Sequence, residues 1–447
     1  MGAKGIKNVF SNRNILVVST TQILETFFSM VYTPFWTLFL MYELHFTIPM
    51  VALLHTIQSS ENLLFSLPGG FLTDRIGRKK VTLVSATTRI ISPIIYLTAT
   101  SWEPVFIATL FVAMRSLGTP AYEAMVAESL PRDQMGTGYA ILNMCRRAPG
   151  LFSGVIGGVL MDSLGLGPGT RLCLVGVLIG GVITFLARYF FLTETLVRTP
   201  GRRRNIVQDF KELLPVLKGS LRIMMVSSIL FQISARLTSG LLVVYVTEYP
   251  AGPGLTNTEY GLLSTIMSIV SFIMALPGGT MADRYNRRKL ITFGRTLHPL
   301  TTLAWIFFKD FYQILGMRLI QGIGEGISGA AGGMGGGAYG GGSAWSSLLA
   351  DLVPMEKRGR YSGLLNTLSG IAALPAPNIG AWMWETEGVG PVGILWTQLF
   401  VGLSSTSLIW LFLKDPVRDV KKIEETAKDD GDKEGSNKKD ERGEESF

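Results

Sequence analysis

The sequence predicts an all-α integral membrane protein with twelve transmembrane helices in two similar halves. Three observations predict this fold class. Only 17% of the 447 residues are charged, whereas soluble domains carry about 25% charged residues. Apolar windows long enough to cross a bilayer recur along the chain, and one charged loop motif occurs twice. This composition excludes an ordinary soluble enzyme.

Twelve apolar windows define the expected spans. A helix needs about 20 predominantly apolar residues to cross the hydrocarbon core of a bilayer. Because backbone groups in lipid must be paired internally, each window is expected to be helical. The expected spans are residues 15–41, 48–72, 81–100, 104–130, 139–161, 171–193, 221–247, 259–281, 290–308, 311–353 with an interruption, 361–384 and 392–413.

Lysine and arginine residues concentrate in alternate connections between these spans. The basic connections include residues 4–13, 75–80, 198–218, 284–289 and 357–360. The opposite connections contain only Arg171 and Lys309. Basic residues gather on the cytoplasmic side of membrane proteins, so we expect both chain termini in the cytoplasm and the protein in the cell membrane.

The charged residues are also uneven along the chain. Residues 414–447 contain 9 basic and 12 acidic residues, a net charge of −3, which leaves +11 for the preceding body. A basic body is typical of proteins that bind nucleic acid or anionic lipid, and the apolar background here favours the lipid bilayer over nucleic acid. The tail is poor in apolar residues and is expected to be disordered.

One loop motif is duplicated. The segment Gly70-Phe-Leu-Thr-Asp74-Arg75-Ile-Gly77-Arg78-Lys79-Lys80 recurs 209 residues later as Gly279-Thr-Met-Ala-Asp283-Arg284-Tyr-Asn286-Arg287-Arg288-Lys289. We therefore expect one six-helix half at 1–197, a basic cytoplasmic linker at 198–220 and a second half at 221–413. Internal repeats are common in secondary transporters, which bind substrate between the repeats.

The second half carries a glycine-rich insertion. Residues 330–343 contain eight glycines, and each glycine costs a helix roughly 1 kcal/mol relative to alanine. A continuous span ten is therefore not expected, and we predict an excursion near the cytoplasmic side. This insertion is either a tolerated flexible segment or a gating element.

The duplicated motif, the twelve spans and the basic linker resemble the major facilitator superfamily. The resemblance covers residues 1–413 and implies that fold, with a cytoplasmic charge network that locks the outward-facing state. The implied gating residues are Gly70, Asp74, Arg75, Gly77, Arg78 and Lys79, with Gly279, Asp283, Arg284, Arg287 and Arg288 in the second copy. Glu128 and Asp351 are the expected partners. The second copy departs from the family pattern at Asn286, which predicts a weaker lock.

Two charged residues lie near the expected midplane. Glu25 is about ten residues into span one and Arg115 about ten residues into span four, at a rise of 1.5 Å per residue. This depth would allow the two side chains to face each other, and Arg115 matches the span-four arginine of the resembled family, which is linked to proton transfer in antiporters. Because a nearby charge shifts the pKa of an acid, Glu25 is the candidate proton and substrate site. The alternative is a structural ion pair.

Further residues are candidates for a substrate cavity. They are Tyr32, Trp36, Tyr122, Arg236 and Glu325. For the aromatic residues the alternative is simple packing, and for the charged residues it is a pair between helices. Arg89, Arg146, Arg147 and Arg295 are expected to extend toward the cytoplasm.

Two short patterns bear on the direction of transport. Ser153-Gly154-Val-Ile-Gly157-Gly158 in span five and Ala376-Pro377-Asn-Ile-Gly380-Ala381 in span eleven are incomplete copies of a pattern seen in antiporters of the resembled family. Their small residues permit close approach of helices, which is the default interpretation. They favour export only mildly.

The predicted function is secondary transport. The chain has no Gly-x-x-x-x-Gly-Lys-Ser/Thr phosphate loop, so ATP-driven pumping by this chain is not supported. We predict a monomeric transporter, not an enzyme, with no cofactor and no metal. It would be driven by an ion gradient, preferably of protons, and would export small amphipathic or drug-like molecules. The alternatives are uptake or exchange of an anionic metabolite or sugar, and a membrane sensor that binds without transporting.

Overall fold

The computed structural model describes residues 11–130, 142, 144–146, 148–195, 219–328, 343–353 and 358–413. The glycine-rich insertion, most of the basic linker and the charged tail lie outside these residues, except that Ser343 begins a helix. The predictions for those segments stay predictions.

The described residues form helices and no strands. The first half contains α2 (Arg13–Tyr32), η1 (Thr33–Phe35), α3 (Trp36–Leu38), η2 (Phe39–Glu43), α4 (Ile48–Ile76), α5 (Arg78–Thr98), α6 (Trp102–Met114), η3 (Arg115–Gly118), α7 (Thr119–Ser129), α9 (Gly150–Leu164) and α10 (Leu166–Phe191). The second half contains α12 (Ser220–Leu237), α13 (Leu241–Thr247), α14 (Asn257–Arg284), α15 (Arg287–Phe307), α16 (Phe311–Ser328), α17 (Ser343–Leu352), α18 (Arg358–Ala373), α19 (Ala376–Glu385) and α20 (Gly390–Phe412).

These helices correspond to the twelve expected spans. Span one is α2 to η2, span four is α6 to α7, span seven is α12 and α13, span ten is α16 and α17, and span eleven is α18 and α19, while a single helix supplies each of the others. Seven helical segments among the described residues are by themselves long and apolar enough to cross a membrane. The multi-pass, all-α prediction is confirmed.

Several spans are interrupted where one continuous helix was expected. Span four changes to a 3-10 turn at Arg115–Gly118, just before Pro120. Span seven stops at Leu237, and Gly240 adopts a left-handed conformation with φ of 77° before α13 begins. A side chain at position 240 would collide with His55 of α4, so the close contact between the two halves requires glycine there.

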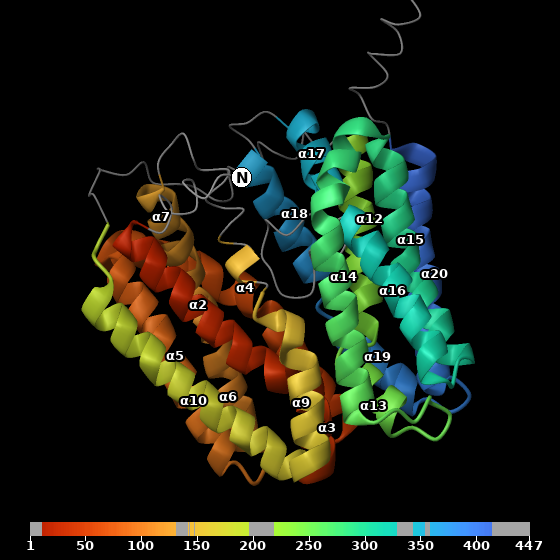
Figure 1. Cartoon of the computed structure of the whole chain (residues 1–447), viewed down its shortest axis with the longest axis horizontal. Coiled ribbons are helices and arrows are strands. Elements are labelled where there is room, and N and C mark those ends of the chain that lie inside the picture. Colours follow the sequence, from red (N-terminus) through yellow and green to blue (C-terminus); the bar gives the residue numbers. More distant parts are fainter. Residues whose placement is uncertain are drawn as a thin grey trace, which may run out of the picture.

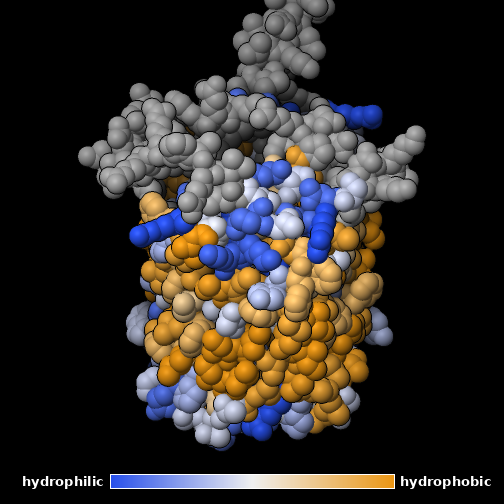
Figure 2. All heavy atoms as spheres, turned by 90° about the vertical axis from the view of Figure 1, so that its left-hand side faces the viewer, coloured by the Kyte–Doolittle hydropathy of each residue, from blue (hydrophilic) through white to orange (hydrophobic). Residues whose placement is uncertain are grey.

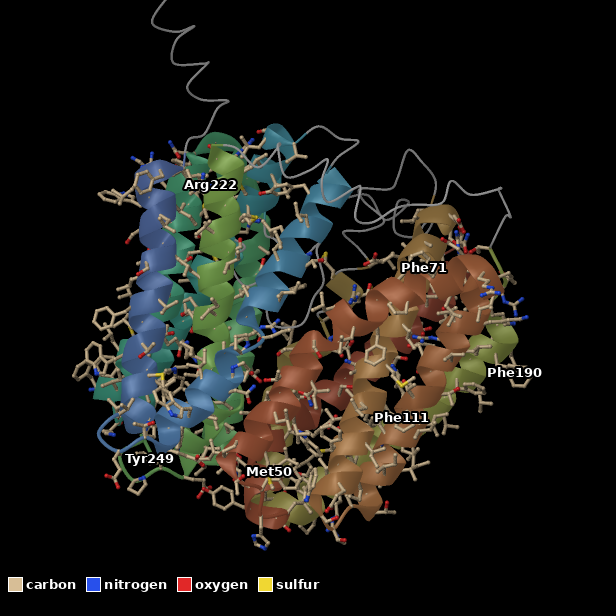
Figure 3. The ribbon with its side chains drawn as sticks, turned by 180° about the vertical axis from the view of Figure 1, so that it is seen from behind. Met50, Phe71, Phe111, Phe190, Arg222 and Tyr249 are labelled. Carbon is tan, nitrogen blue, oxygen red and sulfur yellow. The ribbon has the colours of Figure 1, made fainter. Side chains whose placement is uncertain are left out.

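The two halves are separate groups of helices that meet at one end. In Figure 1 their ribbons approach each other at the lower edge, where α3, α9, α13 and α19 lie, and diverge toward the upper edge. The contacts between the halves join α9 to α14, α4 to α19 and α18, and α3 to α13. Arg222 lies at the upper end and Met50 and Tyr249 at the lower end of the bundle (Figure 3).

The basic connections gather at one end. The starts of α5, α12 and α15 lie at the end where the ribbons diverge, as the alternation of basic residues predicts. The outer face in Figure 2 shows a broad hydrophobic band bounded by hydrophilic residues at both ends, as expected for a bilayer-spanning surface. The assignment of the diverging end to the cytoplasm follows from the basic residues alone.

The glycine patterns of spans five and eleven lie at helix crossings. A Cβ at Gly154 would lie 2.8 Å from the carbonyl oxygen of Gly261 on α14. A Cβ at Gly380 would collide with the backbone of Leu237 at the end of α12. The predicted close approach of helices at both patterns is confirmed.

Candidate functional site

The first copy of the loop motif is held by two carboxylates. Gly77 separates α4 from α5 with φ of 103°, a conformation that favours glycine. The guanidinium of Arg78 pairs with Glu128, as predicted. Glu194, which the sequence analysis missed, accepts hydrogen bonds from the backbone N–H groups of Arg78 at 3.0 Å and Lys79 at 3.1 Å. A carboxylate at a helix N-terminus is stabilised by the helix dipole.

The other residues of the first copy lie in the end of α4 and the start of α5, on either side of Gly77. Asp74 and Arg75 are exposed, and Asp74 makes no ion pair with any described residue. Gly70 lies where a Cβ would touch Pro120 of α7 at 4.0 Å. The ammonium group of Lys79 lies 5.9 Å from the ring centroid of Tyr189.

The second copy is built differently. Arg287 pairs with Asp351, which confirms the predicted partner. Asn286 caps α15 with its own side chain, because its Oδ1 accepts from the N–H of Lys289 at 3.3 Å. Arg284 is the last residue of α14 and Arg288 lies in the first turn of α15. The side chain of Asp283 and the surroundings of Gly279 lie outside the described part of the molecule.

The predicted pairing of Glu25 with Arg115 is wrong. The carboxylate of Glu25 lies 3.0 Å from the guanidinium of Arg89 on α5 and 3.0 Å from that of Arg188 on α10. Arg188 also donates to the hydroxyl of Thr21 at 3.2 Å. The side chain of Glu25 is only 5% exposed, because it lies between three helices of one half.

The space beside Glu25 is too small for a drug-like ligand. The cavity lined by Glu25, Phe28 and Arg89 has a volume of about 10 Å³, room for about one water molecule. Drug-sized ligands occupy pockets of about 300–1,000 Å³. The geometry therefore favours the alternative considered for Glu25, a structural ion pair.

Arg115 is paired with a different acid. Its guanidinium lies 3.9 Å from the carboxylate of Glu61 on α4. The side chains of Arg115 and Glu61 are 35% and 24% exposed, much more than that of Glu25. Arg89 interacts electrostatically with both Glu25 and Glu61, so it connects the buried charges to the more exposed pair.

The predicted cavity aromatics divide into two groups. Trp36 is buried in the core of the first half, stacked on Phe39 with ring centroids 5.4 Å apart and tilted against Tyr96 at 4.7 Å. Tyr32 meets the edge of Trp36 at 5.6 Å and is only partly buried. Tyr122, also partly buried, lies under the guanidinium of Arg146 at 5.7 Å. Trp36 therefore packs in the core, the alternative considered for the aromatics.

Glu325 belongs to a polar network inside the second half. Gln321 donates to Glu325 at 2.8 Å and accepts from Arg318 at 2.8 Å, both contacts within α16. Nδ1 of His298 on α15 lies 3.7 Å from Glu325. Glu325 is buried, which favours a pair between helices over a substrate contact.

Arg236 and Arg295, inside the second half, have no carboxylate at ion-pair distance among the described residues. Arg236 on α12 is partly buried, and its Nη1 has no hydrogen-bond partner in the described part of the chain. Arg295 donates to Ser227 at 2.9 Å and lies 4.0 Å from the ring centroid of Trp345. The prediction that Arg89 and Arg295 extend toward the cytoplasm is wrong, because both bind partners inside their own half. Arg147 lies outside the described residues.

The residues that the sequence analysis missed had weak signals. Arg188 sits near the end of span six, where a basic residue is ordinary. Glu194 is an acid directly after the same span and shortly before the run of arginines at 202–204, and this contrast could have singled it out.

Comparison with known proteins points to one family. A family model described as Major Facilitator Superfamily matches residues 18–252 and 224–440. Two curated relatives are the multidrug resistance proteins MdtG of Salmonella typhi, 22% identical, and of Dickeya zeae (strain Ech586), 23% identical. Each alignment covers 58% of this chain and 62% of the relative, so the chain spans about three fifths of the length of these proteins.

Solved structures show the same fold. A crystal structure of a mutant of the nucleoside transporter NupG aligns with a TM-score of 0.70 at 12% identity and covers 89% of this chain and 99% of that protein. A D-xylose-proton symporter aligns with a TM-score of 0.66 at 13% identity, over 90% of this chain and 97% of that protein. At such identities the likeness concerns the fold alone.

Proposed function

Because the chain belongs to the major facilitator superfamily and is therefore a membrane transporter, we propose that it exports small amphipathic molecules in exchange for protons. The observation that carries the proposal is the pair of Glu61 and Arg115, a titratable acid beside the span-four arginine, both partly exposed. The names of the MdtG relatives support drug-like substrates. We further propose that it acts as a monomer in the cell membrane, with both termini in the cytoplasm.

Glu61 takes the role that the sequence analysis gave to Glu25. Proton coupling of this kind needs an acid next to Arg115, and in the structure that acid is Glu61. A positively charged substrate binds the ionised form of the Glu61 carboxyl group, so a Glu61 that is protonated before binding must lose its proton as the substrate takes its place beside it. Because a neighbouring charge changes the proton affinity of an acid, substrate binding would then be coupled to release of a proton.

The test uses inside-out vesicles with an acidic interior. Lipophilic cations, neutral drugs, sugars and organic anions are added in turn while the pH gradient is recorded. We expect drugs to dissipate the gradient with the unaltered protein and not with Glu61→Gln. Glu123→Gln is the matched control, because it removes an acid at membrane depth that does not pair with Arg115, and it should leave the response intact.

Three results would count against this proposal. If no drug dissipates the gradient, export coupled to protons is excluded for the compounds tested. If Glu61→Gln behaves like the unaltered protein, Glu61 does not carry the proton. If Glu25→Gln loses coupling at unchanged stability while Glu61→Gln keeps it, the proton pathway runs through the buried arginine-paired acid instead.

The second candidate is uptake or exchange of an anionic metabolite or sugar. It is favoured by Arg236, whose buried Nη1 lacks a hydrogen-bond partner among the described residues, and by Arg115. A buried donor without a partner is costly, and an anionic substrate would relieve that cost. Arg236→Ala and Arg115→Ala should then raise the KM for a transported anion, whereas drug export should not depend on Arg236.

A further inference from the structure

The two halves are closed against each other at the end opposite the basic connections. There α9 of the first half runs against α14 of the second, while the ribbons diverge at the other end (Figure 1). A transporter that alternates access must separate these helices to open the closed face. The contacts that hold α9 on α14 therefore decide how readily it opens.

Part of the contact is backbone against backbone. Side chains at Gly154, Gly158 or Gly261 would collide with the backbone of the facing helix. The N–H of Val155 on α9 also donates to the hydroxyl of Thr265 on α14 at 3.1 Å. Glycine crossings of this kind allow close approach but hold no charge.

The other part is a carboxylate that caps a helix of the opposite half. Asp162, in the last turn of α9, accepts three hydrogen bonds from the first two residues of α14. Nδ2 of Asn257 donates at 2.9 Å, and the backbone N–H and hydroxyl of Thr258 donate at 2.7 Å and 2.6 Å. The first N–H groups of a helix have no partner within the helix, and a negative charge there also gains from the helix dipole.

The start of α14 already has a cap of its own. Thr256 and Glu259 form a capping box, in which the Thr256 hydroxyl accepts from the Glu259 N–H at 3.2 Å and Glu259 accepts from the Thr256 N–H at 2.8 Å. These two contacts stay within α14 and its cap residue. Asp162 satisfies the N–H of Thr258 from across the boundary between the halves, so it is not needed merely to begin the helix.

We propose that Asp162 is a latch that holds the closed face of the transporter shut and must release Asn257 and Thr258 before that face opens. The latch is a positioning contact between the halves. It rests on transport by alternating access and not on the proton coupling or drug export proposed above.

The surroundings of Asp162 keep the latch charged. Partial burial alone would raise the pKa of Asp162, but the hydrogen bonds from Thr258 and Asn257 together lower it below its ordinary value. A lowered pKa means that the charged carboxylate stabilises the closed face at every pH above the ordinary value, and that this contribution is lost only as the pH falls through the lower value. Moderate acidification at the closed face therefore leaves the latch in place.

The test measures how often the closed face opens. Ser264 on α14 faces Gly154 of α9, with a Cβ at Gly154 only 3.5 Å from its own. In a protein with Cys145 and Cys173 replaced by alanine, Ser264→Cys is labelled with a membrane-impermeant maleimide applied to the side opposite the basic connections. Asp162→Ala should label about tenfold faster or more, because hydrogen bonds to a charged group are lost.

Two further variants make the result specific. Asp162→Asn keeps one acceptor oxygen for Thr258 and should label at an intermediate rate. Glu259→Gln weakens the cap that stays within the second half, and should label like the protein with Asp162 intact. Equal rates for Asp162→Ala and the unaltered protein would overturn the proposal, as would an equal increase in Glu259→Gln. Because labelling needs neither substrate nor a proton gradient, its result is independent of the proposed export.

Discussion

The two halves bury arginine at corresponding places by different means. Between the first, third and sixth spans of the first half, Glu25 lies 3.0 Å from Arg89 and from Arg188. Between the corresponding spans of the second half, Arg295 contacts no described carboxylate. It donates to Ser227 and lies over the rings of Trp345 and Phe231, at 4.0 Å and 5.0 Å from their centroids.

The hydroxyls around Arg295 complete this second arrangement. The hydroxyl oxygens of Ser227 on α12 and Ser405 on α20 lie 3.0 Å apart, and each hydroxyl is also within hydrogen-bond distance of the carbonyl oxygen of the other residue, at 3.1 Å and 2.8 Å. An ion pair is therefore replaced by an aromatic contact and a pair of serines. The two halves share their helices and connections, but they stabilise the buried arginine with different partners.

Removal of Glu25 should have the largest effect on stability if the halves differ in this way. Glu25→Gln leaves two guanidinium groups close together without a counter-charge, and breaking a buried ion pair on one side costs about 3–5 kcal/mol. We expect the free energy of unfolding in mixed micelles to fall by about that amount. The variant with Glu25, Arg89 and Arg188 all changed to Met should recover most of it. A loss for Glu25→Gln below about 1 kcal/mol, typical of an exposed pair, would contradict the buried triad.

Removal of the helix caps in the two copies of the loop motif should lower the free energy of unfolding by less than removal of Glu25 does. The loss should be larger for the cap of α5 than for the cap of α15. Glu194→Ala removes a charged cap from α5 and should cost about 2 kcal/mol, since both hydrogen bonds and the dipole interaction are lost. Asn286→Ala removes the neutral local cap of α15 and should cost about 1 kcal/mol. Unfolding of both variants in the same micelles checks the order. Equal losses of unfolding free energy for the two variants would show that Glu194 stabilises the start of α5 no more than a local neutral cap does.

Removal of Arg295 should have the smallest effect. Arg295→Met loses a cation–π contact but also removes the cost of burying a charge, and replacement of buried ionic groups by apolar ones is often neutral. We expect the free energy of unfolding to change by less than about 1 kcal/mol. Thermal unfolding with ligand-free protein measures this. A loss as large as that of Glu25→Gln would mean that the serine and aromatic surroundings bind the cation as strongly as a carboxylate does.

The class of the molecule and its loop partners could be predicted from the amino-acid sequence alone. Apolar windows predicted twelve spans, because bilayer thickness sets helix length, and the repeated motif indicated two similar halves. The partners Glu128 for Arg78 and Asp351 for Arg287 were also predictable, because each acid ends a span on the same side of the membrane as its arginine. Depth along the membrane follows from residue count.

Which charged residues meet inside the bundle depends on how the helices pack. Residue count predicts a similar depth for Glu25 and Arg115, but the carboxylate of Glu25 pairs with α5 and α10 and the guanidinium of Arg115 with α4. The direction of a side chain depends on its angle around the helix, and at 3.6 residues per turn a shift of one residue changes this angle by about 100°. The average hydrophobicity of a window of residues does not depend on that angle and therefore cannot predict it. The roles of Asp162 and Glu194 could not be predicted either. Both carboxylates accept from backbone N–H groups of helices that are far away in the sequence. Such partners become visible only when the helices are packed.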